Sequence, residues 1–142
     1  MGEAIAYYDP GADITAQHVS GNVGGRCVSW PTSRQTGGPS GISDSGLGVV
    51  VVDNPAANAE VFGVTANDVA ANGYVNIMRA PKVVPIECSA AVAIGDFVST
   101  GADGRIAKGT SGTGKAIGRA LSVGSTGTYA AVLLFPTSVA AP

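Results

Sequence analysis

VFGVTANDVAANGYVNIM, residues 61–78, contains two strand-like runs and the turn between them. Val61–Thr65 and Tyr74–Met78 are short runs rich in β-branched and aromatic residues, which favour strands over helices. The connection ends in Asn72-Gly73, a pair that readily adopts the positive φ that a tight turn requires. This part of the chain therefore predicts two β-strands joined by a turn.

The same pattern extends in both directions from this centre. Leu47–Val52 (LGVVVV) is a continuous β-branched run, which predicts a strand buried on both faces. Lys82–Cys88 contains Pro85, which cannot donate a ladder hydrogen bond, so we expect an edge strand or a bulge there. Further predicted strands are Arg26–Trp30, Asp96–Ser99, Gly104–Ala107, Ala116–Leu121 and Tyr129–Phe135. The sequence thus predicts an all-β fold, a small β-barrel or β-sandwich of about seven to nine short strands.

The predicted β domain spans residues 19–136. Residues 1–18 are expected to form an extended N-terminal arm, and residues 137–142 a loose tail. Residues 31–46 are rich in Gly, Ser, Thr and Pro and predict a long, flexible polar loop inserted in the domain. Trp30, at the base of this loop, is either a core residue or an interface anchor. Tyr7 and Tyr8 either contact a neighbouring subunit, because Tyr is enriched at interfaces, or cover the edge of their own core.

An internal similarity indicates a duplicated unit. Phe62-Gly63 and Ile117-Gly118 are 55 positions apart, as are Tyr74 and Tyr129, and Ile77 and Val132. Gly25–Ser29 resembles Gly95–Ser99 at an offset of 70. The difference between the offsets, 70 − 55 = 15, is about the length of the polar loop after Trp30. We therefore expect two copies of one β unit, with the loop inserted in the first copy.

The charge of the chain is low and unevenly distributed. Charged residues make up 13% of the sequence, about half of the usual ~25%, and the net charge is −2. This argues against nucleic-acid binding by phosphate neutralisation, and no apolar run approaches the ~18 residues that span a membrane. Residues 97–142 have one acid and four bases, namely Arg105, Lys108, Lys115 and Arg119. These bases either lie on solvent-facing turns and strands or bind an acidic partner surface.

No residue set predicts catalysis, a metal site or a bound cofactor. Cys27 and Cys88 lie in apolar runs, do not form a C-x-x-C pair, and are expected to be buried free thiols. His18 is the single histidine and has no nucleophile motif beside it. Gly109–Ala116 (GTSGTGKA) nearly matches the phosphate-binding loop but has Ala116 where the motif requires Ser or Thr, so we expect a hairpin tip there. The N-terminus lacks the basic region of a signal peptide.

The spacing of turn glycines and strand hydrophobics resembles that of the small capsid decoration (cement) proteins of tailed bacteriophages. The resemblance covers roughly residues 20–135. Residues 1–18 and the 31–46 loop depart from it. The residues that form it are Ala93–Val98, Gly104, Ala116–Leu121, Gly127 and Ala131–Leu134, with Val61–Val64, Gly73 and Val75 upstream.

This resemblance implies a non-enzymatic protein, made in the host cytoplasm and bound to the outer surface of the virion shell. As a homotrimer it would bind the major capsid protein and stabilise contacts between its subunits. One alternative is another virion component, a head fibre or tail-tube β protein. A second alternative, a small hydrolase or sugar-binding module, would require a cleft in which aspartates converge near Trp30.

Overall fold

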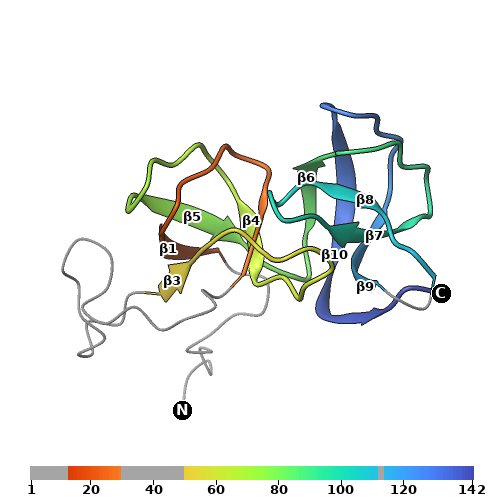
Figure 1. The fold of residues 1–142 in the computed structure, drawn as a ribbon, viewed down its shortest axis with the longest axis horizontal. Coiled ribbons are helices and arrows are strands. Elements are labelled where there is room, and N and C mark those ends of the chain that lie inside the picture. The colour runs from red at the N-terminus through yellow and green to blue at the C-terminus, as the bar shows by residue number, and fades with distance from the viewer. Residues whose placement is uncertain (1–12, 30–49, 112–113) are drawn as a thin grey trace, which may run out of the picture.

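The fold is that of two small five-stranded β units joined side by side (Figure 1). The computed structural model describes residues 13–29, 50–111 and 114–142. Unit 1 consists of β1 (Ile14–His18), β2 (Cys27–Val28), β3 (Val50–Val52), β4 (Gly63–Thr65) and β5 (Tyr74–Met78). Unit 2 consists of β6 (Val83–Glu87), β7 (Phe97–Thr100), β8 (Ile106–Lys108), β9 (Lys115–Ala120) and β10 (Tyr129–Ala140). The described residues contain no helix, which confirms the all-β prediction.

Each unit is a sheet whose two edge strands also meet. The strand order is β2-β4-β5-β1-β3 in unit 1 and β6-β10-β9-β7-β8 in unit 2. In unit 1, the isolated bridge between Ser29 and Asp53 joins the ends of β2 and β3. In unit 2, the bridge between Cys88 and Ile106 joins the end of β6 to β8. Both sheets therefore curl into barrel-like closure, which covers the exposed strand edges that promote aggregation.

The two units share one topology, as the internal similarity predicts. Four strands of unit 1 are adjacent in the order β2-β4-β5-β1, and their counterparts in unit 2 are adjacent in the order β7-β9-β10-β6. The last strands, β3 and β8, occupy equivalent places because each lies between the two edges of its sheet. Residues 29–49 separate β2 from β3, whereas only residues 101–105 separate β7 from β8. The longer connection between the second and third strands therefore lies in unit 1.

Backbone hydrogen bonds repeat at the same offsets. The His18 amide donates to the Gly73 carbonyl at 2.9 Å, and the Cys88 amide donates to the Thr128 carbonyl at 2.8 Å. The donors are 70 positions apart and the acceptors 55. The duplication is thus a property of the backbone and not only of a Gly- and Val-rich composition.

The repeated glycine of the two units has a steric cause. A Cβ at Gly63 would lie 2.6 Å from the Met78 carbonyl oxygen, and one at Gly118 would lie 2.5 Å from the Leu133 carbonyl oxygen. Both distances are shorter than real Cβ contacts, so only glycine allows the neighbouring strand to approach this closely. The Phe-Gly and Ile-Gly pairs of the sequence mark this position in each unit.

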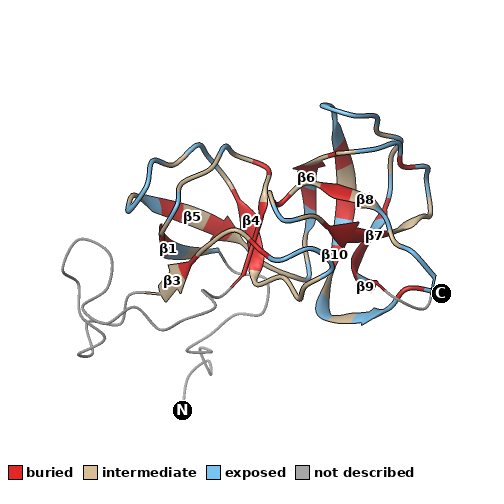
Figure 2. Ribbon diagram, in the orientation of Figure 1, coloured by how far each residue is buried: buried red, intermediate tan, exposed pale blue. Residues whose placement is uncertain are grey.

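Two apolar clusters hold the fold together. The smaller cluster lies inside unit 1 and includes Val28, Val52, Val75 and Ile77. The larger cluster fills unit 2 and extends across the contact between the units to include Cys27 and Val64. Figure 2 shows buried residues within the strands of both units and exposed residues gathered in the connecting loops. Because the larger cluster contains residues of both units, separation of the units would expose core side chains.

Several predicted strands occur where the sequence placed them. Pro85 lies in β6, an edge strand of its sheet, as expected from its missing N–H. Asn72 has a φ of 62°, as the Asn-Gly turn requires.

Two other predictions need correction. Gly109–Ala116 is not a hairpin tip, because it connects β8 to β9 and these strands are not neighbours in the sheet. The run expected at Leu47–Val52 is described only as β3, Val50–Val52, in which only Val52 is buried.

Both predicted chain ends need correction. The expected arm of residues 1–18 overlaps β1, which pairs antiparallel with β5 and parallel with β3. Its sequence, ITAQH, has no strong apolar alternation because two of its buried residues, Gln17 and His18, are polar. The expected loose tail of residues 137–142 overlaps β10, which continues past Pro136 and pairs Val139 with Ala116. A register shift after Leu134 accommodates the proline, so the strand resumes beyond it. The predicted loop 31–46 lies outside the described residues.

Candidate functional site

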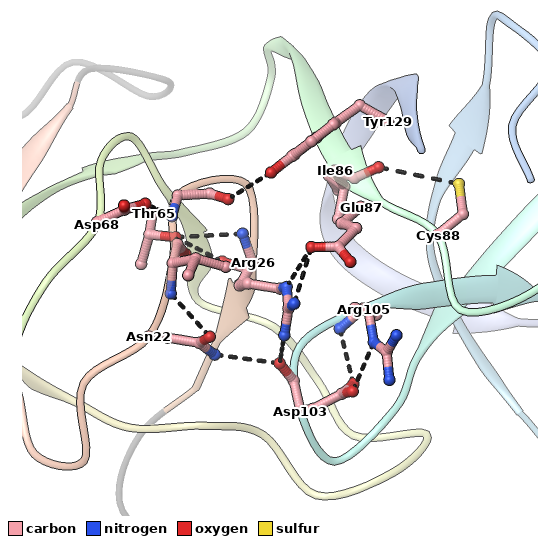
Figure 3. Close-up of polar contacts among 12 residues, drawn as sticks. Asn22, Arg26, Thr65, Asp68, Ile86, Glu87, Cys88, Asp103, Arg105 and Tyr129 are labelled. Atoms are coloured by element: carbon pink, nitrogen blue, oxygen red, sulfur yellow. Dashed lines mark hydrogen bonds and ion pairs between the residues drawn. The ribbon is translucent and has the colours of Figure 1, made fainter. Parts of the chain in front are cut away.

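The most extensive polar cluster of the described residues is the junction between the two units. Arg26, directly before β2, extends into unit 2, where its Nε and Nη2 donate to Glu87 Oε2 at 3.0 and 2.8 Å. Its Nη1 donates to the Asp103 carbonyl at 3.2 Å. Figure 3 shows the guanidinium between these two acceptors. Both side chains of the ion pair are only 15% exposed, so the charges are partly removed from water and held by each other.

Backbone groups join the units on either side of this ion pair. The Cys27 amide donates to the Gly104 carbonyl at 2.8 Å, and the Glu87 amide donates to the Gly25 carbonyl at 3.0 Å. These two bonds extend the hydrogen-bonded network of each unit into the other. Asn22 strengthens the contact by donating from Nδ2 to the Asp103 carbonyl at 3.1 Å.

Two glycines allow the backbones to come this close. Gly25 has a φ of 76° and lies under the Tyr129 ring, where an added Cβ would be 2.4 Å from a ring carbon. The Tyr129 hydroxyl donates to the Gly24 carbonyl at 3.3 Å. Gly104 has a φ of 81° and faces β2 of the other unit. Both glycines therefore combine a left-handed backbone with a close approach that any side chain would block.

The apolar part of the junction lies behind these polar contacts. Cys27 and Val64 are fully buried, and they pack into the core cluster of unit 2. Burial raises the pKa of the Cys27 thiol to about 12, so the thiol stays neutral and unreactive in the folded protein. Cys88 is also buried and free, which confirms the state expected for both cysteines.

A cavity of about 260 Å³ also lies at the junction. Its lining comes from unit 1 through Phe62 and Arg79 and from unit 2 through Ile117 and Phe135. The Arg79 guanidinium lies 4.5 Å from the centroid of the Phe62 ring, so it is stacked on an aromatic face of the same unit. The volume is below that of ordinary small-molecule sites, which are about 300–1,000 Å³.

The four predicted basic residues each have a partner within the chain. Arg105 pairs with Asp103 at 2.6 Å, Lys108 with Asp96 at 3.3 Å and Lys115 with Glu60 at 4.0 Å. Arg119 donates from Nε to the Gly95 carbonyl at 3.0 Å and lies over the Phe97 ring. The structure therefore distributes these bases over separate acidic and aromatic partners in unit 2 and at its contact with unit 1.

Other residues singled out from the sequence lie apart from the junction. Tyr7, Tyr8 and Trp30 are outside the described residues. His18 is fully buried in unit 1, and its Nδ1 accepts a hydrogen bond from the Gly21 amide at 3.0 Å. Burial lowers the pKa of His18, and the nearby Asp53 carboxylate opposes this shift. In the described part of the chain, no three His, Cys, Asp or Glu side chains are grouped to hold a metal ion.

Sequence reasoning missed Arg26, Glu87 and Tyr129 as a group. Arg26 and Glu87 are 61 positions apart and belong to different units, so no local pattern relates them. The repeated Tyr74 and Tyr129 gave one signal, because the two tyrosines are equivalent in the units. Of these two tyrosines, Tyr129 is the one that donates a hydrogen bond to the other unit in the contacts described above.

The described residues contain no helix that is long and apolar enough to span a membrane.

The sequence matches no protein-family model, and no curated protein matches it. Among solved structures, the fold is similar to the head fibre gp8.5 N base of bacteriophage phi29, with a TM-score of 0.67 and 16% sequence identity. The similarity covers 90% of this chain and 97% of the phage protein's chain. The chain therefore shares its fold with a protein of a phage head.

Proposed function

We propose that the chain is a structural, non-enzymatic protein of a tailed-phage head, and that it forms the base by which a head fibre is attached to the shell. The observation that carries this proposal is the likeness to the phi29 head fibre base, which extends over 90% of the chain. The resemblance of its glycine and strand pattern to decoration proteins of phage heads supports the same location. A decoration role without a fibre is the second candidate.

The junction between the units suits such a role. A protein that attaches to a shell must transmit force between its contacts, and the Arg26–Glu87 ion pair and the shared core join the two units. We expect the major capsid protein to be the partner and the chain to act as a homo-oligomer, a trimer in the case of the decoration reading. Many identical weak contacts over a shell would together give strong attachment.

Co-sedimentation with phage shells tests the proposal. The purified chain is mixed with expanded shells and with precursor shells of the major capsid protein of the same phage. We expect saturable binding to expanded shells. Binding to neither shell would overturn the head assignment, and formation of tubes or rings by the chain alone would favour a tail-tube protein.

Heating separates the two candidate roles. A decoration protein raises the temperature at which expanded shells rupture, because it stabilises contacts between capsid subunits. A fibre base binds the same shells and leaves the rupture temperature unchanged. Shells without the added chain, heated in the same buffer, provide the reference.

The candidate contact residues are tested on the same shells. Deletion of residues 1–12 removes Tyr7 and Tyr8 and spares β1, which begins at Ile14. We expect this deletion to weaken binding to the shells.

The bases Arg105, Lys108, Lys115 and Arg119 are tested by ionic strength. If they meet an acidic surface, binding to the shells weakens between low and moderate ionic strength. Unchanged binding would exclude these bases as contacts.

A further inference from the structure

Unit 2 exposes four large apolar side chains, three in its β6–β7 and β9–β10 loops and one on β10. Ile94 is 69% exposed, Val123 67%, Leu121 47% and Leu133 38%. We call these four residues the distal face. Figure 1 shows the loop between β6 and β7, which contains Ile94, in unit 2. Exposed apolar patches of this kind mark interaction sites on soluble proteins.

Leu133 belongs to a row of three residues across neighbouring strands of unit 2. The equivalent row of unit 1 is the surface by which unit 1 packs on unit 2. In unit 1, cross-strand pairing places Cys27 beside Val64 and Val64 beside Met78. In unit 2, it places Phe97 beside Arg119 and Arg119 beside Leu133. The three positions correspond at offsets of 70, 55 and 55.

The environments of these two equivalent rows differ. The row of unit 1 contacts the core of unit 2, with Cys27 and Val64 fully buried and Met78 packed against them. In the row of unit 2, Arg119 and Leu133 are exposed. A surface that is an interface in unit 1 is therefore open in unit 2.

The loop part of the distal face follows the same correspondence. Ile94 occupies the position of Gly24, at an offset of 70. Leu121 and Val123 occupy the positions of Ala66 and Asp68, at an offset of 55. Small or polar residues therefore stand at these positions in unit 1, and large apolar residues stand at the equivalent positions in unit 2.

The unit 1 surface at the internal junction packs beneath Tyr129 of unit 2, and unit 1 has an equivalent tyrosine. Within the chain, Tyr129 covers Gly25 and donates its hydroxyl to the Gly24 carbonyl. Its equivalent in unit 1 is Tyr74, which is 54% exposed in β5. Within the part of the chain that the structure describes, unit 2 thus exposes the counterpart of the unit 1 row, and unit 1 exposes the counterpart of Tyr129.

We propose that the distal face of one chain docks on the Tyr74 surface of a second copy of the same chain, in a head-to-tail contact that repeats the internal junction. A contact between different surfaces of identical chains continues to further copies, and it closes into a ring if the rotation between copies permits. This proposal concerns the chain alone and does not depend on the phage-head assignment.

The contact between copies should lack a counterpart of the buried ion pair, and Arg119 stands at the position of Val64 in its row. Asp96 stands at the position of Arg26, and Gln17 at the position of Glu87. Asp96 is already paired with Lys108 at 3.3 Å, so the buried ion pair of the internal junction has no counterpart. Association between copies is therefore expected to depend on the exposed apolar side chains of the distal face rather than on a buried ion pair.

Mixing two variants tests both the surface and its polarity. In the first variant, Ile94→Asp and Val123→Asp place charges on the distal face. In the second, Tyr74→Glu places a charge on the receiving surface. Both sets of positions are more than half exposed, so the fold should tolerate them, and thermal unfolding of each variant confirms this. Oligomeric state is measured by sedimentation velocity across a dilution series.

The wild-type chain is expected to self-associate, and each variant alone to remain monomeric, with self-association weakened at least about tenfold. An equimolar mixture should form a one-to-one dimer, because the second variant keeps an intact distal face and the first keeps an intact Tyr74. Val139→Asp, an exposed apolar position outside both surfaces, is the matched control and should associate as wild type.

Three results would overturn the proposal. One is a wild-type chain that stays monomeric at about 100 μM, far above the ~1 μM Kd of a moderate complex. Another is self-association of the Tyr74→Glu variant by itself, which would mean that distal faces pair with one another. The last is a mixture that forms no dimer. In each case, shell binding by the same variants would still test the head assignment separately.

Discussion

Gly104 and Cys27 bring the backbones of the two units into close contact: a Cβ added at Gly104 would lie 2.5 Å from the Cys27 carbonyl oxygen. Gly104 lies in the turn between β7 and β8, and Cys27 begins β2. The Gly104 carbonyl accepts a hydrogen bond from the Cys27 amide at 2.8 Å. The two units are therefore joined at a point that admits no side chain.

We expect Gly104→Ala to destabilise the protein more than Gly127→Ala. The two glycines have φ values of 81° and 80°, so both variants carry the same backbone strain of about 1–2 kcal/mol. Gly127 has no atom within 4 Å of an added Cβ, whereas Gly104 faces β2. The clash should lower the free energy of unfolding by about 1–3 kcal/mol more, as measured by urea denaturation. Equal losses in the two variants would contradict the close approach.

Arg26→Gln is expected to lower the free energy of unfolding by about 3 kcal/mol, because it leaves the Glu87 carboxylate partly buried and unpaired. Lys108→Gln is the matched control. Its pair with Asp96 involves a lysine that is 68% exposed, so the loss should stay below about 1 kcal/mol. A double-mutant cycle with Glu87→Gln measures the coupling of the pair, and a coupling near zero would show that Arg26 acts by packing alone.

The Cys27 thiol should report the opening of the junction. It is fully buried between the units, and its pKa is raised to about 12, so a thiol reagent should react with the native protein only through opening motions. We expect Arg26→Gln to increase the labelling rate of Cys27, measured by mass spectrometry of peptides. Cys88 belongs to the same core cluster but packs beside Gly124 within unit 2, and it serves as the internal reference. Equal acceleration at both cysteines would indicate global unfolding instead.

The single histidine predicts a pH dependence in a defined window. Burial lowers the pKa of His18, so the unfolded chain takes up a proton near pH 6.5 that the folded chain rejects. Stability from this residue is complete above about pH 6.5 and decreases as the pH falls towards the lower folded-state pKa. The melting temperature should therefore decrease between pH 7 and pH 5.

His18→Asn is the corresponding variant, because an amide oxygen can accept the hydrogen bond from the Gly21 amide. We expect it to reduce the slope of melting temperature against pH in this window, whatever its effect at pH 7. Hydrogen bonds from Lys82 to Asp13 and from the Ala93 amide to Asp96 lower the pKa of these carboxyl groups, away from the window. An unchanged slope would show that His18 does not couple to folding.

The sequence alone predicted the strands whose signals are local. Asn72-Gly73 defines a turn by its backbone preference, and Pro85 in β6 requires an edge because it lacks an N–H. The offsets of 55 and 70 indicated the duplication, since glycine at positions 63 and 118 is required by the same close strand approach in each unit. Local chemistry repeated in both units is readable without a structure.

The ends of the fold and the junction depended on tertiary contacts. β1 carries the buried polar residues Gln17 and His18, and its pairing with β3 and β5 cannot be inferred from ITAQH. Arg26 and Glu87 are 61 positions apart and meet only because the two units pack together. Ile94 and Gly24 show the same division: the sequence relates them as equivalent positions, but packing alone determines that Gly24 accepts a hydrogen bond from Tyr129 and that Ile94 is exposed to solvent.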